Sequence, residues 1–419
     1  MKPMGAVPPG YSAKGSNLII AGKKASEWID IAGNSPAFIY DFAQVAARIA
    51  VLRRALPPVV GIHYAIKANP FAPLVRAIAP LVDGCDVASG GELALVMREA
   101  PGMSISFAGP GKRDGEIVAA VHAGATLNCE SEHEVARALA AGERLGIRPR
   151  LAVRVNPAFE LRGSGMKMGG RASPFGVDAE RVPALVGAIL AGGADWQGFH
   201  IFAGSQALDT AAIIETQAAT LALAGQLAQS VGVVPPLVNL GGGFGVPYFA
   251  DDLPVDIARI GEALHGAMAS LPAMLQGAGF AVELGRWLVA QAGVYLTRIV
   301  DRKESRGETF LVTDGGLHHQ LAASGNFGTV VRRNYPIALA NRMGALPLET
   351  VSVVGCLCTP LDRLGDKVAL PRGEPGDVVA LFMAGAYGPT ASPVAFLGHP
   401  APAELLAGLD DNPNAIFTS

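Results

Sequence analysis

Short apolar runs alternate with longer helical stretches between residues 62 and 286, and this alternation restricts the fold more than any other feature of the chain. The helical stretches, such as Glu132–Leu145 and Ala211–Gln229, carry alanine and leucine at helical spacing. Eight strand–helix units over roughly 225 residues are typical of a (β/α)8 barrel, although a doubly wound open sheet has the same alternation. The eight expected strands are Ile62–Lys67, Asp83–Val87, Ser104–Ala108, Ala125–Cys129, Leu151–Val155, Gly198–Phe202, Leu237–Leu240 and Phe280–Glu283.

The pattern changes after Arg286, where valine-rich runs are separated by Gly, Pro, Asp and Arg. Such runs predict antiparallel β structure. Two early runs, Asn17–Ala21 and Ala37–Tyr40, predict strands that join this later domain. We therefore expect N-terminal strands over residues 1–44, a barrel over residues 45–286 and a C-terminal β domain over residues 287–419. The valine-rich runs are Trp287–Ile299, Glu308–Thr313, Glu349–Gly355 and Asp377–Ala384.

Composition excludes several classes of protein. The chain has 419 residues, of which 50% are hydrophobic and 16% charged, so a folded protein is expected and disorder is not. A net charge of −3 without a long basic run argues against a nucleic-acid partner. The lack of a long apolar run argues against a membrane helix and a secretory signal. The four cysteines lack the spacing of a zinc site, so we expect no metal and a reduced, cytoplasmic protein.

Lys67 ends the first expected strand, in the segment His63-Tyr64-Ala65-Ile66-Lys67-Ala68-Asn69-Pro70. Alternation places His63, Ala65 and Lys67 on one face of that strand. A lysine at the carboxyl end of a buried strand can lose its proton through partial desolvation and attack a carbonyl. A lysine that simply reaches water is the alternative from this segment alone.

Glycines and two charged residues follow the last two expected barrel strands, where phosphate often binds in such a fold. Gly241, Gly242 and Gly243 could expose backbone N–H groups as an anion nest, with Arg286 as a nearby cation. An ordinary turn and a surface ion pair are the alternatives. Glu283 ends an apolar strand, so its carboxylate needs a partner, and a protonated ring nitrogen would serve.

Taken together, these segments resemble the pyridoxal-phosphate-dependent decarboxylases of fold type III, the group of diaminopimelate, ornithine and arginine decarboxylases. The shared motifs are Y-A-I-K-A-N, D-V-A-S-x-G-E, R-V-N-P, G-S-Q, G-G-G-F-G, E-x-G-R and A-G-A-Y-G, and they span nearly the whole chain. The segments Gly163–Gly176 and Gly315–Pro336 look most like the subfamily associated with exosortase systems and polysaccharide gene clusters. The resemblance implies an alanine racemase-like barrel followed by a decarboxylase β domain.

The resemblance also implies roles for individual residues. Lys67 would hold pyridoxal 5'-phosphate as an internal aldimine, Glu283 would face the pyridine nitrogen, and Cys358 would reach the active site of the other subunit in a homodimer. The other cofactor-binding positions that it implies are Asp86, Arg154, Phe202, Ser205, Gly241, Gly242, Gly243, Gly285, Arg286 and Tyr387.

Two positions depart from the family pattern. Phe202 stands where the family has a histidine that stacks on the cofactor ring, and His200 lies two residues earlier on the same strand face. Thr359 stands where diaminopimelate and ornithine enzymes have an acid that meets the distal amine of the substrate. The substrate here would then lack a distal positive charge, unless Asp362 compensates; Tyr387 is a further substrate-binding candidate.

The expected reaction is the α-decarboxylation of an amino acid, free or carried on an acyl carrier protein, through an external aldimine and a quinonoid. Cys358 is the first candidate for returning the proton, and His200 is the second. A diaminopimelate-type or diamine-precursor decarboxylase remains open, as does an amino-acid racemase, although Glu283 argues against the latter. A non-catalytic homologue would have lost the cofactor ligands. The loop Gly163–Gly176 is a candidate lid or carrier contact, or simply a solvated loop.

Overall fold

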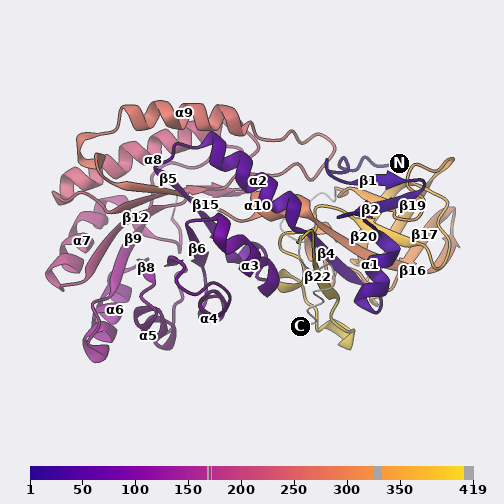
Figure 1. Ribbon diagram of the computed structural model, residues 1–419, viewed down its shortest axis with the longest axis horizontal. Coiled ribbons are helices and arrows are strands. Elements are labelled where there is room, and N and C mark those ends of the chain that lie inside the picture. Colours follow the sequence, from indigo (N-terminus) through magenta and orange to yellow (C-terminus); the bar gives the residue numbers. More distant parts are fainter. Residues whose placement is uncertain (168, 171, 325–332, 410–419) are drawn as a thin grey trace. The chain divides into compact units, whose positions relative to one another are not determined.

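The computed structural model describes residues 1–167, 169–170, 172–324 and 333–409, which form two compact units (Figure 1). The barrel unit comprises Arg48–Gly245 and Pro254–Gly285. The β unit comprises Met1–Ala47, Val246–Leu253 and Arg286–Ser419. The sequence did not predict that the short segment Val246–Leu253 belongs to the β unit. Parts of the segments 163–176 and 315–336 lie outside the described residues.

Eight parallel strands close into a barrel because β9 pairs with both β8 and β12. This closure confirms the barrel and excludes the open doubly wound sheet. The order around the barrel is β5, β6, β7, β8, β9, β12, β14, β15 and back to β5. The strands are β5 (Val60–Ala65), β6 (Gly84–Val87), β7 (Ile105–Phe107), β8 (Thr126–Cys129), β9 (Arg150–Asn156), β12 (Asp195–Ile201), β14 (Leu237–Gly242) and β15 (Gly279–Leu284).

Helices alternate with these strands along the chain and lie around the outside of the sheet in Figure 1. In α6 (Glu132–Leu145), the Ser131 side chain caps the N-terminus and Gly146 ends the helix in the left-handed conformation. The expected stretch Ala211–Gln229 corresponds to α8 (Thr210–Val231). The remaining helices of the barrel unit are α3 (Ala72–Ile78), α4 (Gly90–Glu99), α5 (Asp114–His122), α7 (Val182–Ala191) and α9 (Ile257–Ala269), and α2 (Phe42–Ala55) leads into it.

The β unit is built around the long strand β16 (Gly293–Ser305), which pairs antiparallel with β4 (Ala37–Asp41), β17 (Glu308–Thr313) and β21 (Val378–Leu381). The expected N-terminal run Ala37–Tyr40 therefore joins this sheet as β4. The other run forms β2 (Asn17–Ile20) in a separate small sheet. The remaining elements are β1 (Ser12–Lys14), β3 (Lys23–Lys24), α1 (Ala25–Ala32), β18 (Ile337–Leu339), β19 (Leu348–Val354), β20 (Arg363–Pro371) and β22 (Ala403–Ala407).

Two details differ from the expected strands. The run Trp287–Ile299 begins with the short helix α10 (Arg286–Val289) and a 3-10 turn, and only then becomes β16. The strands β1, β3, β18, β20 and β22 were not expected; the sequence of β20, for example, mixes charged and apolar residues. Among the described residues, no helix is both long and apolar enough to span a bilayer.

Candidate active site

Lys67 lies just beyond the carboxyl end of β5, in the 3-10 turn Ile66–Ala68. The prediction that the strand runs to Lys67 was therefore wrong by two residues. The chain turns early because the Asn69 N–H donates to the Ile66 carbonyl at 3.0 Å, and the Tyr64 hydroxyl donates to the Asn69 carbonyl at 2.7 Å. The turn buries Ile66 and Ala68 but leaves the Lys67 side chain 47% exposed, so its amine projects from the end of the barrel.

Glu283, near the end of β15, joins Lys67 and His200. Lys67 Nζ donates to Glu283 Oε1 at 3.1 Å, and His200 Nε2 lies 3.0 Å from Glu283 Oε2. Burial opposes ionisation of this carboxyl group. The charge of Lys67 and the hydrogen bond from His200 outweigh burial and hold the pKa of Glu283 well below its usual range. The carboxylate is thus ionised at neutral pH, which is the state that can pair with a protonated ring nitrogen.

Phe202 and His200 place two rings beside this ion pair. Their rings are nearly parallel, at 25°, with centroids 6.4 Å apart. Lys67 Nζ lies 5.7 Å from the centroid of Phe202. His200 is 1% exposed, and its Nδ1 has no hydrogen-bond partner among the described residues. Glu283 thus contacts His200, and Phe202 supplies an apolar ring face near the Lys67 amine.

Asp86, in β6, has a buried carboxylate whose two oxygens lack hydrogen-bond partners in the described part of the chain. Its Oδ2 lies 3.4 Å from His63 Nδ1. Burial disfavours the charged form of His63, but the nearby Asp86 carboxylate raises the pKa of His63 overall. His63 was not among the predicted site residues, although alternation placed it on the same strand face as Lys67. The pairing with His63 leaves the Asp86 oxygens without a hydrogen bond of ordinary geometry among the described residues, which fits the wall of a site that receives a ligand.

Arg154, in β9, is neutralised by a buried acid that the sequence analysis missed. Its Nη1 donates to Glu130 Oε1 at 3.0 Å. Glu130 also accepts backbone N–H groups from Gly109 and Gly176. Burial opposes ionisation of Glu130, but the nearby Arg154 and Lys112 lower its pKa. Arg154 therefore belongs to a network that fastens loops at the carboxyl ends of neighbouring strands, and no local sequence pattern indicates this network.

The backbone contacts of Gly241, Gly242 and Gly243 differ from those of the expected anion nest. The Gly241 N–H already donates to Asn239 Oδ1 at 2.9 Å, so an anion nest would lack one of the three amides. Gly243 has a φ of 74°, and a Cβ there would collide with the Gly204 carbonyl. Neighbouring backbone thus requires glycine at Gly243 whether or not phosphate binds.

Ser205 and Gly285 also lie at the carboxyl ends of barrel strands. Ser205 belongs to the two-residue strand Gly204–Ser205, which pairs with Met166–Lys167. Gly285 follows β15, and a Cβ there would crowd Ala65 and Ala68. The absence of a side chain at Gly285 lets the end of β15 pack against the turn that carries Lys67.

In the β unit, Arg286 is surrounded by tyrosines. Its Nη1 donates to the Tyr248 hydroxyl at 3.1 Å, and its guanidinium lies 4.6 Å from the centroid of Tyr387. Tyr335 stacks on Tyr248 with centroids 4.6 Å apart. The buried Nε of Arg286 has no partner among the described residues. Tyr248 and Tyr335 were missed, because neither lies in a motif that suggested a site.

The candidate residues on the loop after β19 differ in exposure. Cys358 is exposed. The Thr359 hydroxyl accepts the Leu361 N–H at 3.3 Å. Asp362 is 3% exposed, and its two oxygens accept the N–H groups of Leu317 and Leu357 at 2.7 and 2.9 Å. These bonds argue against Asp362 as a partner for a substrate amine.

Comparison with known proteins identifies the family of the chain. Residues 42–290 match the family of the pyridoxal-dependent decarboxylase pyridoxal-binding domain. The chain belongs to this family. It is 37% identical over 379 residues to an L-glutamyl-[BtrI acyl-carrier protein] decarboxylase of Niallia circulans, covering 89% of this chain and 88% of that protein. It is 32% identical over 374 residues to a diaminopimelate decarboxylase of Deinococcus radiodurans, covering 89% and 90%.

The fold comparison agrees. A diaminopimelate decarboxylase of M. jannaschii in complex with L-lysine superposes with a TM-score of 0.87 at 25% identity, over 95% of this chain and 93% of that one. This decarboxylase therefore uses pyridoxal 5'-phosphate. The residues present fit that group, because the Asp86 carboxylate, the ionised Glu283 and the half-exposed Lys67 amine all lie at the carboxyl ends of neighbouring barrel strands. These comparisons show the family of the chain but do not show that it belongs to the exosortase-associated subfamily.

Proposed function

We propose that this decarboxylase removes the α-carboxyl group of an amino acid whose distal end carries no ammonium group, and that the amino acid is presented on an acyl carrier protein. The observation that carries the proposal is the neutral Thr359 beside an Asp362 whose oxygens are both occupied by backbone N–H groups. The 37% identity to an enzyme named for a carrier-linked glutamyl substrate supports it.

The residues of the barrel unit take the following proposed roles. Lys67 binds the cofactor covalently, and Glu283 keeps a proton on the pyridine nitrogen. His200 hydrogen-bonds Glu283 and so fixes its orientation. When bound, pyridoxal 5'-phosphate supplies the electron sink that decarboxylation needs. Phe202 offers a stacking face but, unlike histidine, exchanges no proton.

The anionic end of the cofactor needs cations and donors. We assign Arg286 to the phosphate, because its Nε is buried and without a partner in the described residues. Tyr387 lies against the same guanidinium and is assigned with it. The glycines Gly242, Gly243 and Gly285, together with Ser205, complete the proposed phosphate contacts. Asp86 and Arg154 are assigned to the wall of the pocket.

The proton that replaces carbon dioxide needs a donor, and Cys358 is the proposed one. Its exposure in a single chain suits a residue that serves the active site of another subunit. We therefore propose a homodimer with shared active sites.

Carbon dioxide release from a panel of substrates tests the proposal. The panel is L-glutamyl acyl carrier protein, free L-glutamate, L-ornithine, L-arginine and meso-diaminopimelate. The proposal predicts that the carrier-linked substrate reacts with the highest kcat/KM. Preference for diaminopimelate or a free basic amino acid would contradict it in favour of a diamine-type decarboxylase. Inversion of a free amino acid without gas release would indicate a racemase.

The assignment to the exosortase-associated subfamily remains a proposal of the same kind. It rests on the segments Gly163–Gly176 and Gly315–Pro336, which include residues outside the described part of the chain. Decarboxylation of a carrier-linked amino acid would support this subfamily assignment. Lys167 and Arg171 on the first segment would then be candidate carrier contacts.

A further inference from the structure

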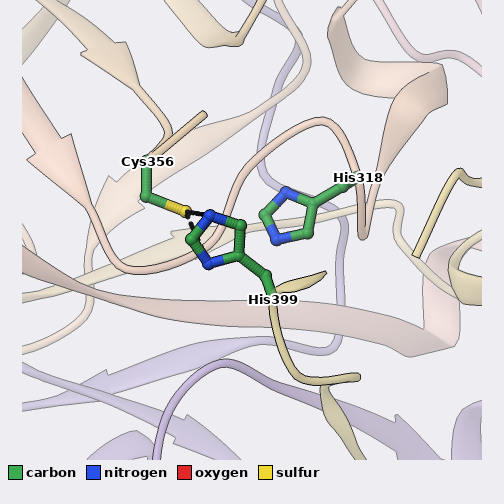
Figure 2. A group of neighbouring side chains, drawn as sticks. All are labelled: His318, Cys356 and His399. Atoms are coloured by element: carbon green, nitrogen blue, oxygen red, sulfur yellow. Dashed lines mark hydrogen bonds between the residues drawn. The ribbon is translucent and has the colours of Figure 1, made fainter. Parts of the chain in front are cut away.

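Three metal-ligating side chains from distant parts of the sequence meet in the β unit: His318, Cys356 and His399 (Figure 2). Their ligand atoms all lie within 4.8 Å of one another. His318 follows β17, Cys356 follows β19, and His399 follows the short turn Phe396–Gly398. No role in decarboxylation has been assigned to any of the three.

The ring of His399 lies beside the thiol of Cys356 in Figure 2. Cys356 Sγ is 3.9 Å from Nδ1 and 3.8 Å from Nε2 of His399. The ring centroids of His318 and His399 are 5.2 Å apart. Around tetrahedral zinc, with metal–ligand bonds of about 2.0–2.3 Å, ligand atoms lie roughly 3.5 Å from one another. Small side-chain rotations would therefore bring the three ligand atoms to these separations.

His318 gives an independent indication of a ligand. It is 0% exposed, and neither ring nitrogen has a hydrogen-bond partner among the described residues. A buried imidazole with both nitrogens unsatisfied is unfavourable, and a metal bound to one nitrogen would remove part of that cost.

Hydrogen bonds hold the three segments in place. The Asp362 carboxylate accepts the N–H of Leu317, next to His318, and the N–H of Leu357, next to Cys356. The ring of His319 contacts the carbonyl of Pro400, next to His399, at 3.1 Å. The other nitrogen of that ring lies 2.9 Å from the Tyr295 hydroxyl. Each ligand is thus adjacent to a fixed backbone position, as in a preorganised metal site.

We propose that His318, Cys356 and His399 bind one zinc ion, with the fourth coordination position left to water. One thiolate and two imidazoles suit zinc among the common divalent ions. Zinc binding forms a zinc–sulfur bond and releases the thiol proton of Cys356 to solvent.

Zinc content tests the proposal on the full-length protein with its cofactor bound. The protein is mixed with one equivalent of zinc sulfate and desalted, and its zinc is measured by mass spectrometry together with the zinc X-ray absorption spectrum. The expected result is one zinc per chain, with one sulfur in the first shell, and a higher midpoint of thermal unfolding. In Cys356→Ser and His399→Gln, zinc affinity should fall by more than about 100-fold. This is more than the loss of about 10–100-fold that follows when a residue that only hydrogen-bonds to a metal ligand is removed.

The neighbouring Cys358→Ser is the matched control, because this exposed thiol lies two residues from Cys356 and outside the cluster. It should retain zinc as the unmodified protein does. If Cys356→Ser fails to fold, His399→Gln alone decides, since His399 lies in a partly exposed loop. Failure of the unmodified protein to retain zinc would overturn the proposal. So would equal retention by His399→Gln, or equal loss in Cys358→Ser.

Discussion

Lys67 Nζ and Glu283 Oε1 lie 3.1 Å apart across the join between β5 and β15, the first and last strands of the closed barrel. Barrel closure therefore brings together two residues that are 216 positions apart in the sequence. The Lys67 side chain is half-exposed, whereas the Glu283 carboxylate is buried. The amine is therefore the member of the pair that solvent or a ligand can reach. This geometry places the amine that we propose binds the cofactor beside the carboxylate that we propose pairs with the pyridine nitrogen.

Glu283→Gln should alter both catalysis and acid stability. Loss of the charge opposite the ring nitrogen should lower kcat by about 10²–10³-fold. The pKa of Glu283 is depressed in the folded protein, so its ionisation stabilises the fold above the unfolded-state pKa, and this contribution is lost as pH falls through the folded-state pKa. Urea unfolding of the cofactor-free protein from pH 7 downward should therefore show the difference between the wild type and the variant shrinking below about pH 4.5. A difference that stays constant with pH would contradict the assignment.

Arg286→Met should weaken cofactor binding. The variant removes the guanidinium whose Nε lies buried and unsatisfied in the described structure, and it leaves Tyr248 without its donor. Loss of charge-assisted hydrogen bonds to phosphate should raise the Kd of pyridoxal 5'-phosphate by about 10–100-fold. Fluorescence titration of the apoenzyme measures this change. Arg372→Met is the control, because Arg372 pairs only with the exposed Glu374 among the described residues, and its Kd should match that of the wild type.

Shared active sites predict complementation between two inactive variants. Lys67→Ala should be inactive, and Cys358→Ala should lose about 10²-fold in kcat. After the two are unfolded and refolded together, half the dimers are mixed, and each mixed dimer has one unmodified site. Activity should recover to about one quarter of the wild-type value. If the cysteine serves its own barrel, no site in the mixture is complete, and activity stays at the level of the separate variants.

Thr359→Glu should change the substrate preference. A carboxylate at this position would meet a distal ammonium group and repel a neutral or carrier-linked end. The ratio of kcat/KM for meso-diaminopimelate to that for glutamyl acyl carrier protein should rise by about tenfold or more. Thr359→Gln has a similar size without the charge and should leave the ratio near the wild-type value. An unchanged ratio in the glutamate variant would place the substrate's distal end elsewhere.

The barrel could be predicted because each of its strands is a local apolar run bounded by a helix. All eight expected runs overlap strands of the closed sheet, and Glu132–Leu145 matches α6 at both ends. Lys67 shows the limit of this reasoning: alternation continues through Ile66, but a hydrogen bond from Asn69 to the Ile66 carbonyl ends the strand at Ala65. Periodicity does not report such turn bonds.

Contacts between residues from distant segments were the part of the site that the sequence did not predict. Motifs indicated Lys67, Glu283 and Arg286, whereas Glu130 opposite Arg154 and Tyr248 beside Arg286 come from segments without a motif. Asp362 was considered for substrate binding because it is an acid near Cys358. Its role as an acceptor for two backbone N–H groups depends on a loop geometry that the sequence does not encode locally.

The cluster of His318, Cys356 and His399 illustrates the same limit. Local spacing predicts zinc sites when ligands share a turn or a hairpin. Here each ligand comes from a separate loop of the β unit, and only the sheet brings them together. The expectation of no metal rested on local spacing and therefore did not consider this arrangement.

Reductive trapping shows directly whether Lys67 binds pyridoxal 5'-phosphate. The purified protein is treated with sodium borohydride, digested and analysed by mass spectrometry. We expect one phosphopyridoxyl group per chain, located on Lys67, and none in Lys67→Ala. A modification on Lys112 or another lysine, or none on Lys67 in protein that carries its cofactor, would contradict it.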